Sequence, residues 1–179
     1  RGMLPPGDPH HFDRTRRLAF DKADVILIVG TPFDFRMGYG KRISREATLV
    51  QIDLDYRTVG KNRDISLGLV GDPGAILAAV EQAASTRMDK GAKQERQQWM
   101  KQLQEAEAIA LEKLMPLFKS DQSPIHPYRV AYEINEFLGD NTIYIGDGGD
   151  VVTISAEAVG PRGPGNWTEP GAPGSPDVA

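Results

Sequence analysis

The first half of the chain contains short runs that are apolar at nearly every position. Residues 24–30 (DVILIVG), 49–54 (LVQIDL) and 67–70 (LGLV) are three such runs. A continuous apolar run, as opposed to an alternating one, is typical of a parallel strand that is covered on both faces. We therefore predict three strands of a parallel sheet.

Helix-start signals accompany these runs. Asp13 is a candidate N-cap for a helix over residues 14–22, and Asp72, followed by proline, is a candidate N-cap for a helix over residues 73–84. Strands and helices joined by short loops predict an α/β fold, here a partial doubly wound parallel sheet of the Rossmann-like kind. We expect the other half of that sheet to precede Arg1.

The second half of the chain is expected to hold a linker, a long helix and the start of another α/β unit. Residues 85–95 are polar and are interpreted as a linker, which overlaps the start of a long helix with apolar side chains at helical spacing. The tail after Gly160 is rich in proline and glycine, and we expect it to form no core of its own. The elements predicted in this half are helices over residues 94–119, 127–137 and 151–159 and a strand over residues 141–146.

Composition removes several classes of function. The chain has 179 residues, 40% of them hydrophobic, a formal net charge of −4 and no cysteine. The negative net charge does not indicate a nucleic-acid partner. The lack of cysteine excludes disulfides and thiolate metal sites. No run approaches the roughly 20 apolar residues of a membrane span. We expect a cytoplasmic protein. The chain does not begin with Met, and we expect it to be a piece of a longer protein.

Carboxylates stand where two of the predicted strands end. Asp53 and Asp55 lie at the end of the second run, and Asp72 follows the third. Ligands of open α/β sheets bind beyond the carboxyl ends of the strands, where a carboxylate accepts hydrogen bonds from a ribose. These acids predict a nucleotide site. The alternative is a solvated turn and a helix N-cap, and caps are commoner than ribose ligands.

The loop after the first strand is a second candidate site. Gly30 lets a ligand approach the backbone closely, and Arg36 is suited to clamp a phosphate or to stack on a flat ring. The alternative places Phe33 and Phe35 in the core and pairs Arg36 with Asp34 at the surface. The residues alone leave both interpretations open.

A glycine-rich turn over residues 146–150 (GDGGD) is a third candidate site. Gly148 and Gly149 offer backbone N–H groups to an anion such as a diphosphate, although Asp147 and Asp150 would repel it. The alternative is a simple tight turn. None of the three histidines has the spacing of a metal ligand, and the sequence shows no complete catalytic set.

Taken in order, these motifs resemble thiamine-diphosphate enzymes of the acetolactate synthase type. The motifs similar to the middle domain of that family are residues 30–36 (GTPFDFR), 51–55 (QIDLD), 60–62 (GKN) and 71–73 (GDP). Those similar to the opening of its diphosphate-binding domain are residues 124–127 (PIHP), 146–150 (GDGGD) and 161–171 (PRGPGNWTEPG). The resemblance covers nearly the whole chain.

The resemblance implies three parts and three cofactors. The parts are a middle domain of FAD or nucleotide type over residues 1–85, a linker with a long helix over residues 86–122, and the start of the diphosphate-binding domain over residues 123–179. The implied cofactors are thiamine diphosphate and Mg²⁺, with FAD possible in the middle domain. The residues assigned to cofactors in this way are Gly30, Arg36, Asp53, Leu54 and Asp72 for the nucleotide, and Gly148 and Gly149 for the diphosphate.

The implied activity is decarboxylation of a 2-oxo acid followed by carbon–carbon bond formation, in a parent protein expected to be a homo-oligomer. The domain that carries the catalytic glutamate of the family does not match this chain, so we expect the chain alone to be inactive. Two alternatives stay open. One is a 2-hydroxyacyl-CoA lyase or oxalyl-CoA decarboxylase-like enzyme, whose middle domain holds ADP or nothing, and the other is a non-catalytic nucleotide-binding module.

Two features depart from the family pattern. Residues 146–148 (GDG) resemble its Mg²⁺ motif, but they follow the first strand of the domain and Asn166 is too near, so we expect the true motif after Ala179. The family also places a bulky apolar residue, which bends the cofactor, where this chain has Ser175-Pro176-Asp177. Proline fixes φ and supplies no flexible apolar side chain, so we expect either an aberrant terminus or a copy that is not competent.

Overall fold

The computed structural model describes residues 3–4, 7–87 and 91–169, and residues 175–177 therefore lie outside the described part. The chain forms two compact units. One, the sheet unit, is Arg16–Leu103, and the other, the terminal unit, combines Arg1–Thr15 with Gln104–Ala179. The helix α3 (Gly91–Phe118) contributes residues to both units.

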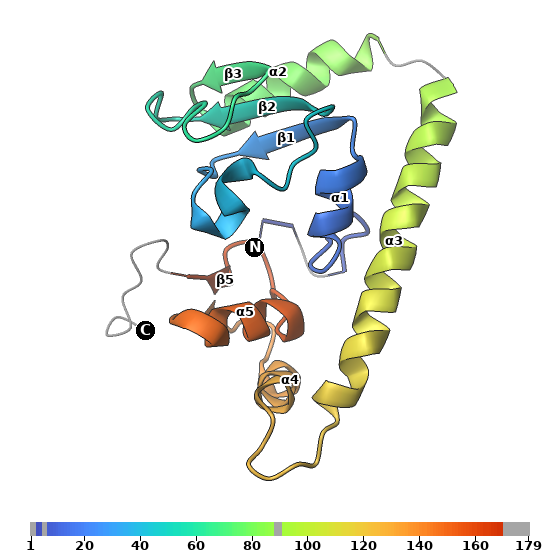
Figure 1. The fold of residues 1–179 in the computed structure, drawn as a ribbon, viewed down its shortest axis with the longest axis vertical. Helices are drawn as coiled ribbons and strands as arrows, with labels where there is room; N and C mark the ends of the chain where they lie inside the picture. The colour runs from blue at the N-terminus through green and yellow to red at the C-terminus, as the bar shows by residue number, and fades with distance from the viewer. Residues whose placement is uncertain (1–2, 5–6, 88–90, 170–179) are drawn as a thin grey trace. The chain divides into compact units, whose positions relative to one another are not determined.

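The sheet unit is built on the three predicted strands, β1 (Val25–Val29), β2 (Thr48–Asp53) and β3 (Leu67–Val70). They pair in parallel in the order β1-β2-β3, with β2 in the centre (Figure 1). Strands that follow one another in this order are what half of a doubly wound sheet requires, since each connection returns the chain to the same end of the sheet. The predicted fold class is confirmed.

One face of this sheet carries the main hydrophobic core. The side chains of a parallel pair that lie opposite each other point to the same face, so Ile26 and Ile28 of β1 share a face with Leu49 of β2. Ile52, three residues after Leu49, points to the other face and is also fully buried, so β2 is covered on both sides. The buried cluster on the first face is Phe20, Ile26, Ile28, Phe33, Ile43, Ala47 and Leu49.

Two helices of the sheet unit, α2 and α1, begin in different ways. The helix α2 (Pro73–Ser85) begins at Asp72, whose Oδ1 accepts a hydrogen bond from the N–H of Ala75, as predicted. The helix α1 (Arg16–Lys22) begins later than expected. The N–H and the guanidinium of Arg14 donate to Glu107 just before this helix, and this long-range partner was not evident in the sequence.

The loop that follows β1 contains a short 3₁₀ helix, η1 (Phe35–Gly40). Asp34 caps it by accepting from the N–H of Arg36. Gly38 and Tyr39 inside it have φ of 56° and 55°. For a tyrosine this left-handed conformation is strained, at a cost of about 1–2 kcal/mol.

The terminal unit holds the expected second α/β element. Its helices α4 (Pro127–Phe137) and α5 (Gly149–Ala158) pack on each other, and its strands β4 (Tyr144–Ile145) and β5 (Trp167–Thr168) pair in parallel. Trp167 is 5% exposed and packs with Ala131 and Val159. The tail thus supplies a strand and a core side chain, which its proline and glycine content did not predict.

The long helix differs from its prediction at the start. It begins at Gly91, inside the segment interpreted as a linker, and includes Pro116. Polar residues 91–95 are helical because glutamine, glutamate, lysine and alanine all favour a helix, which outweighs a single glycine. The domain boundaries at residues 85–86 and 122–123 were drawn from the resemblance to the family, and they stay a prediction.

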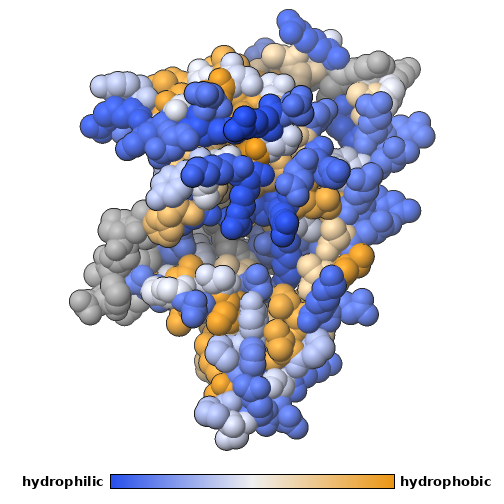
Figure 2. All heavy atoms as spheres, in the orientation of Figure 1, coloured by the Kyte–Doolittle hydropathy of each residue, from blue (hydrophilic) through white to orange (hydrophobic). Residues whose placement is uncertain are grey.

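The surface of the terminal unit exposes several apolar side chains. On the face drawn in Figure 2, apolar and polar side chains alternate over the region of α4 and α5. Within residues 3–4, 7–87 and 91–169, no helix combines the length and apolar character that a membrane crossing needs. Among the described apolar side chains of this unit, the largest exposed fractions belong to Phe137, Met3, Ile143 and Val151.

Candidate nucleotide-binding site

Three loops leave the same edge of the sheet, at the carboxyl ends of β1, β2 and β3. Their starting points are bonded together, because the N–H of Gly30 donates to the carbonyl of Ile52 (2.9 Å) and the N–H of Gly71 donates to the carbonyl of Asp53 (3.0 Å). The parallel ladder thus extends one residue beyond β1 and β3 before the loops diverge. This is the edge at which doubly wound sheets bind ligands.

The acids Asp53 and Asp72 lie at the ends of adjacent strands, as expected. Both also have a local role. Asp53 Oδ1 accepts from the N–H of Asp55 (2.9 Å), and Asp72 Oδ1 accepts from the N–H of Ala75 (2.8 Å). An ionised carboxylate has about four acceptor positions, so one local hydrogen bond leaves room for a sugar hydroxyl. Leu54, next to Asp53, is 70% exposed.

Arg36 forms an ion pair with Asp34 at the start of η1. Its Nη2 lies 2.8 Å from Asp34 Oδ2, and its Nε donates to both carboxylate oxygens. The Arg36 side chain holds the pKa of Asp34 below its ordinary value, mainly through these hydrogen bonds. Phe33 is buried at 1% exposure whereas Phe35 is 58% exposed, so only one of the two aromatic side chains belongs to the core.

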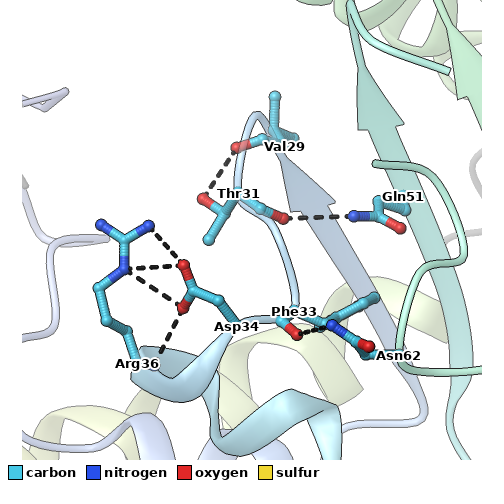
Figure 3. Close-up of polar contacts among 7 residues, drawn as sticks. All are labelled: Val29, Thr31, Phe33, Asp34, Arg36, Gln51 and Asn62. Carbon is cyan, nitrogen blue, oxygen red and sulfur yellow. Dashed lines mark hydrogen bonds and ion pairs between the residues drawn. The ribbon is translucent and has the colours of Figure 1, made fainter. Parts of the chain in front are cut away.

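Gln51 and Asn62, which the sequence analysis gave no role, connect the first two loops (Figure 3). Gln51 Nε2 donates to the carbonyl of Thr31 (3.3 Å), and its Oε1 accepts from the N–H of Gly60 (2.8 Å). Asn62 Nδ2 donates to the carbonyl of Phe33 (3.0 Å). A polar side chain inside the apolar run 49–54 was the available signal for Gln51.

The backbone at Gly30 is open to a ligand. Gly30 has φ of 60°, and a Cβ placed on it would meet no atom within 4 Å. Glycine adopts this conformation without strain, and the missing side chain leaves space beside the loop. A ligand group can therefore approach the peptide closely at this position.

The glycine turn of the terminal unit offers a different arrangement. Gly148 is the N-cap of α5, with φ of 82° and no side-chain cap, and Gly149 has φ of 36° with open space around it. The uncapped N–H groups at the start of α5 suit an anion. Asp147 Oδ1 accepts from the N–H of Gly148 (2.7 Å), and Asp150 lies in the first turn, so two carboxylates oppose that anion.

Metal ligands are not gathered in the described residues. No group of three or more histidine, aspartate or glutamate side chains within residues 3–4, 7–87 and 91–169 is arranged to hold a metal ion. His126, for example, caps α4, its Nδ1 accepting from the N–H of Tyr128 (3.2 Å). The Mg²⁺ implied by the motifs is therefore assigned to none of these residues.

The residues of the sheet unit match a known protein family. Residues 1–80 match the family model described as the central domain of thiamine pyrophosphate enzymes. This match confirms the resemblance to thiamine-diphosphate enzymes seen in the motifs.

Known relatives extend the similarity along the chain. It is 32% identical to 2-hydroxyacyl-CoA lyase 2 of Bos taurus and 34% identical to the Homo sapiens protein of the same name, over 98% of this chain and 28% of each relative. It is 30% identical to the acetolactate synthase large subunit IlvG of Mycobacterium tuberculosis, over 96% of this chain and 30% of that protein. The chain thus spans less than a third of the length of these relatives.

Proposed function

We propose that the sheet unit binds an adenine nucleotide, FAD or ADP, at the carboxyl edge of β1–β3. The observation that carries this proposal is the joining of three loop starts at one edge, where Asp53 and Asp72 end adjacent strands. Gly30 leaves space for the ligand, and Asp53 retains acceptor positions for ribose hydroxyls. Arg36, already paired with Asp34, would approach the ligand as part of that ion pair.

For the parent protein we propose carbon–carbon bond chemistry that depends on thiamine diphosphate. That cofactor, when bound, stabilises the negative charge that develops as the bond to the carbonyl carbon breaks. Gly148 and Gly149 are the residues of this chain proposed to meet its diphosphate, since the start of α5 has no side-chain cap. The parent is proposed to be a homo-oligomer that uses Mg²⁺.

Two reactions are compatible with this class of enzyme. An acetolactate synthase-like enzyme would decarboxylate a 2-oxo acid and join the product to a second one, and similarity to the mycobacterial synthase subunit supports it. A 2-hydroxyacyl-CoA lyase would cleave a carbon–carbon bond of its thioester substrate, and similarity to the vertebrate lyases over 98% of the chain supports it. Yellow flavin absorbance in a purified parent protein favours the synthase, and a colourless protein favours the lyase.

Calorimetric titration of the 179-residue chain with FAD and with ADP tests the nucleotide proposal. We expect micromolar Kd for at least one of them. Asp53→Asn keeps the oxygen that accepts from Asp55 but loses the charge, and we expect its Kd to rise about tenfold because hydrogen bonds to a charged group are stronger. Asp24→Asn is the matched control, because Asp24 also accepts a local backbone hydrogen bond, from the N–H of Val25, but lies at the opposite end of the sheet. Absence of binding by the unaltered chain, or equal Kd for both variants, contradicts the proposal.

A further inference from the structure

Gln51 is a buried polar side chain in the central strand of the sheet. It is fully buried, and it lies on the same face of β2 as Leu49, toward the hydrophobic cluster. A buried amide is costly unless its donor and acceptor are satisfied. Both partners recorded for it are backbone groups of loops, the carbonyl of Thr31 after β1 and the N–H of Gly60 after β2.

The two partners are far apart in the sequence but lie on adjacent loops. Methionine or leucine would fill the same core volume without an amide to desolvate, so filling the core does not account for glutamine here. Asn62 makes a second connection of the same kind, from the second loop to the carbonyl of Phe33. Its φ of 70° is tolerated by asparagine, and it places the amide against the first loop. Figure 3 shows both amides reaching the segment that follows β1.

We infer that Gln51 is a positioning residue that fixes the loop beginning at Gly30 relative to the loop beginning at Asp53. The inference rests on the proposed function in one respect, namely that these loops form the walls of a nucleotide site. Both side-chain hydrogen bonds of Gln51 go to the backbone of the loops, so it acts through them. The sheet hydrogen bonds end at Gly30 and Asp53, and Gln51 sets the separation of the two loops beyond them, at Thr31 and Gly60.

The first test compares Gln51→Met with Leu49→Val in the whole 179-residue chain. Methionine keeps the length and volume of glutamine but cannot replace its two hydrogen bonds. We expect the Gly60 amide to exchange with deuterium at least tenfold faster, and amides of residues 30–36 to exchange faster as well, while those of α2 keep their rates. Leu49→Val weakens the same face of the same strand without altering either loop contact, so it reports on lost stability alone.

The second test measures Kd for FAD and ADP with the same two variants. We expect Kd to rise about tenfold for Gln51→Met, which corresponds to about 1.4 kcal/mol, and less than twofold for Leu49→Val. Asn62→Gly removes the second connection but keeps the left-handed backbone, and Asn62 is exposed, so the fold is retained. We expect this variant to raise Kd about two- to threefold, since only one of the connections is lost.

The outcomes separate the inference from the function on which it rests. If Gln51→Met and Leu49→Val change loop exchange and Kd alike, Gln51 only fills the core and the inference is wrong. If Gln51→Met accelerates exchange in both loops but the unaltered chain binds neither nucleotide, the positioning of the loops stands and the proposed function fails. Faster loop exchange with an unchanged Kd rejects the role of Gln51 in nucleotide binding.

Discussion

The edge of the sheet unit and the glycine turn of the terminal unit are both candidate ligand sites, and they hold their shape by different means. At the sheet edge, side chains fix the loops: Gln51 and Asn62 bind backbone groups, and Arg36 pairs with Asp34. At the turn, Gly148 and Gly149 adopt positive φ, and α5 starts without a side-chain cap. Loops from separate strands need connections between them. A turn that directly joins β4 to α5 depends instead on its own backbone conformation and on the strand pairing that holds β4.

The strand before the glycine turn, β4, is held by β5, which lies in a distant part of the sequence. The N–H of Tyr144 donates to the carbonyl of Asn166 (2.8 Å), and the N–H of Gly146 donates to the carbonyl of Thr168 (3.1 Å). Trp167, between these two partners, is buried in the core of the terminal unit. The comparison therefore predicts that substitutions in β5 disturb the glycine turn, whereas the sheet-edge loops respond mainly to substitutions of their own residues.

The largest expected effect is that of Trp167→Ala. Removal of this buried ring leaves a cavity beside β4, and we expect a loss of about 3–5 kcal/mol in the free energy of unfolding, measured with urea. Phe137→Ala is the matched control, because Phe137 is 88% exposed, and we expect a change of at most about 0.5 kcal/mol. Equal effects of the two substitutions would show that β5 does not hold the terminal unit together.

A smaller effect is expected from alanine at Gly40, in the sheet unit. Gly40 has φ of 72°, and an added Cβ would lie 2.9 Å from the Cβ of Arg63, whose guanidinium donates to the carbonyls of Ile43 and Ser44. Backbone strain and overpacking together predict a loss of about 2–4 kcal/mol in thermal or urea unfolding. Gly30→Ala adds the strain without the clash.

The Gly30→Ala variant is thus the control that isolates strain. We expect it to lose about 1–2 kcal/mol of stability but to weaken nucleotide binding more than Gly40→Ala does, because its Cβ occupies the space beside the loop. A Gly30→Ala chain that binds nucleotide as tightly as the unaltered chain would remove Gly30 from the site.

The smallest effect concerns a side-chain connection between helices of the terminal unit. Tyr128 Oη donates to Glu157 Oε2 (2.6 Å). Burial, and then the neighbouring carboxylate, raise the pKa of Tyr128 from 10.0 to about 12. We expect Tyr128→Phe to lower the free energy of unfolding by about 1 kcal/mol at neutral pH.

The pH dependence of this contact has a definite sign. The folded state holds the Tyr128 proton more tightly than the unfolded state, so the stability from this contact is complete below pH 10 and is lost as the pH rises toward 12. Ultraviolet titration of tyrosinate should show one tyrosine that ionises near pH 12 and is missing in Tyr128→Phe. Its persistence in that variant would assign the high pKa to another tyrosine.

Local signals in the sequence were enough for several elements. The helices α2 and α4 begin where Asp72-Pro73 and His126-Pro127 indicate, because a cap and a proline at the first position act on the nearest backbone groups. Apolar runs identified the three strands of the sheet to within about a residue. Local chemistry also predicted that Asp53 and Asp72 would stand at one edge, since parallel strands end on the same side.

Only the tertiary structure decided which distant groups become partners. Arg14, just before α1, bonds to the distant Glu107, and the strand at Trp167 pairs with β4 and buries its ring in the core of the terminal unit. The roles of Gln51 and Asn62 likewise depend on the adjacency of two loops that are separated in the sequence. Caps, turns and strand runs are set by neighbours along the chain, whereas such pairings arise when folding brings remote backbone groups within hydrogen-bonding distance.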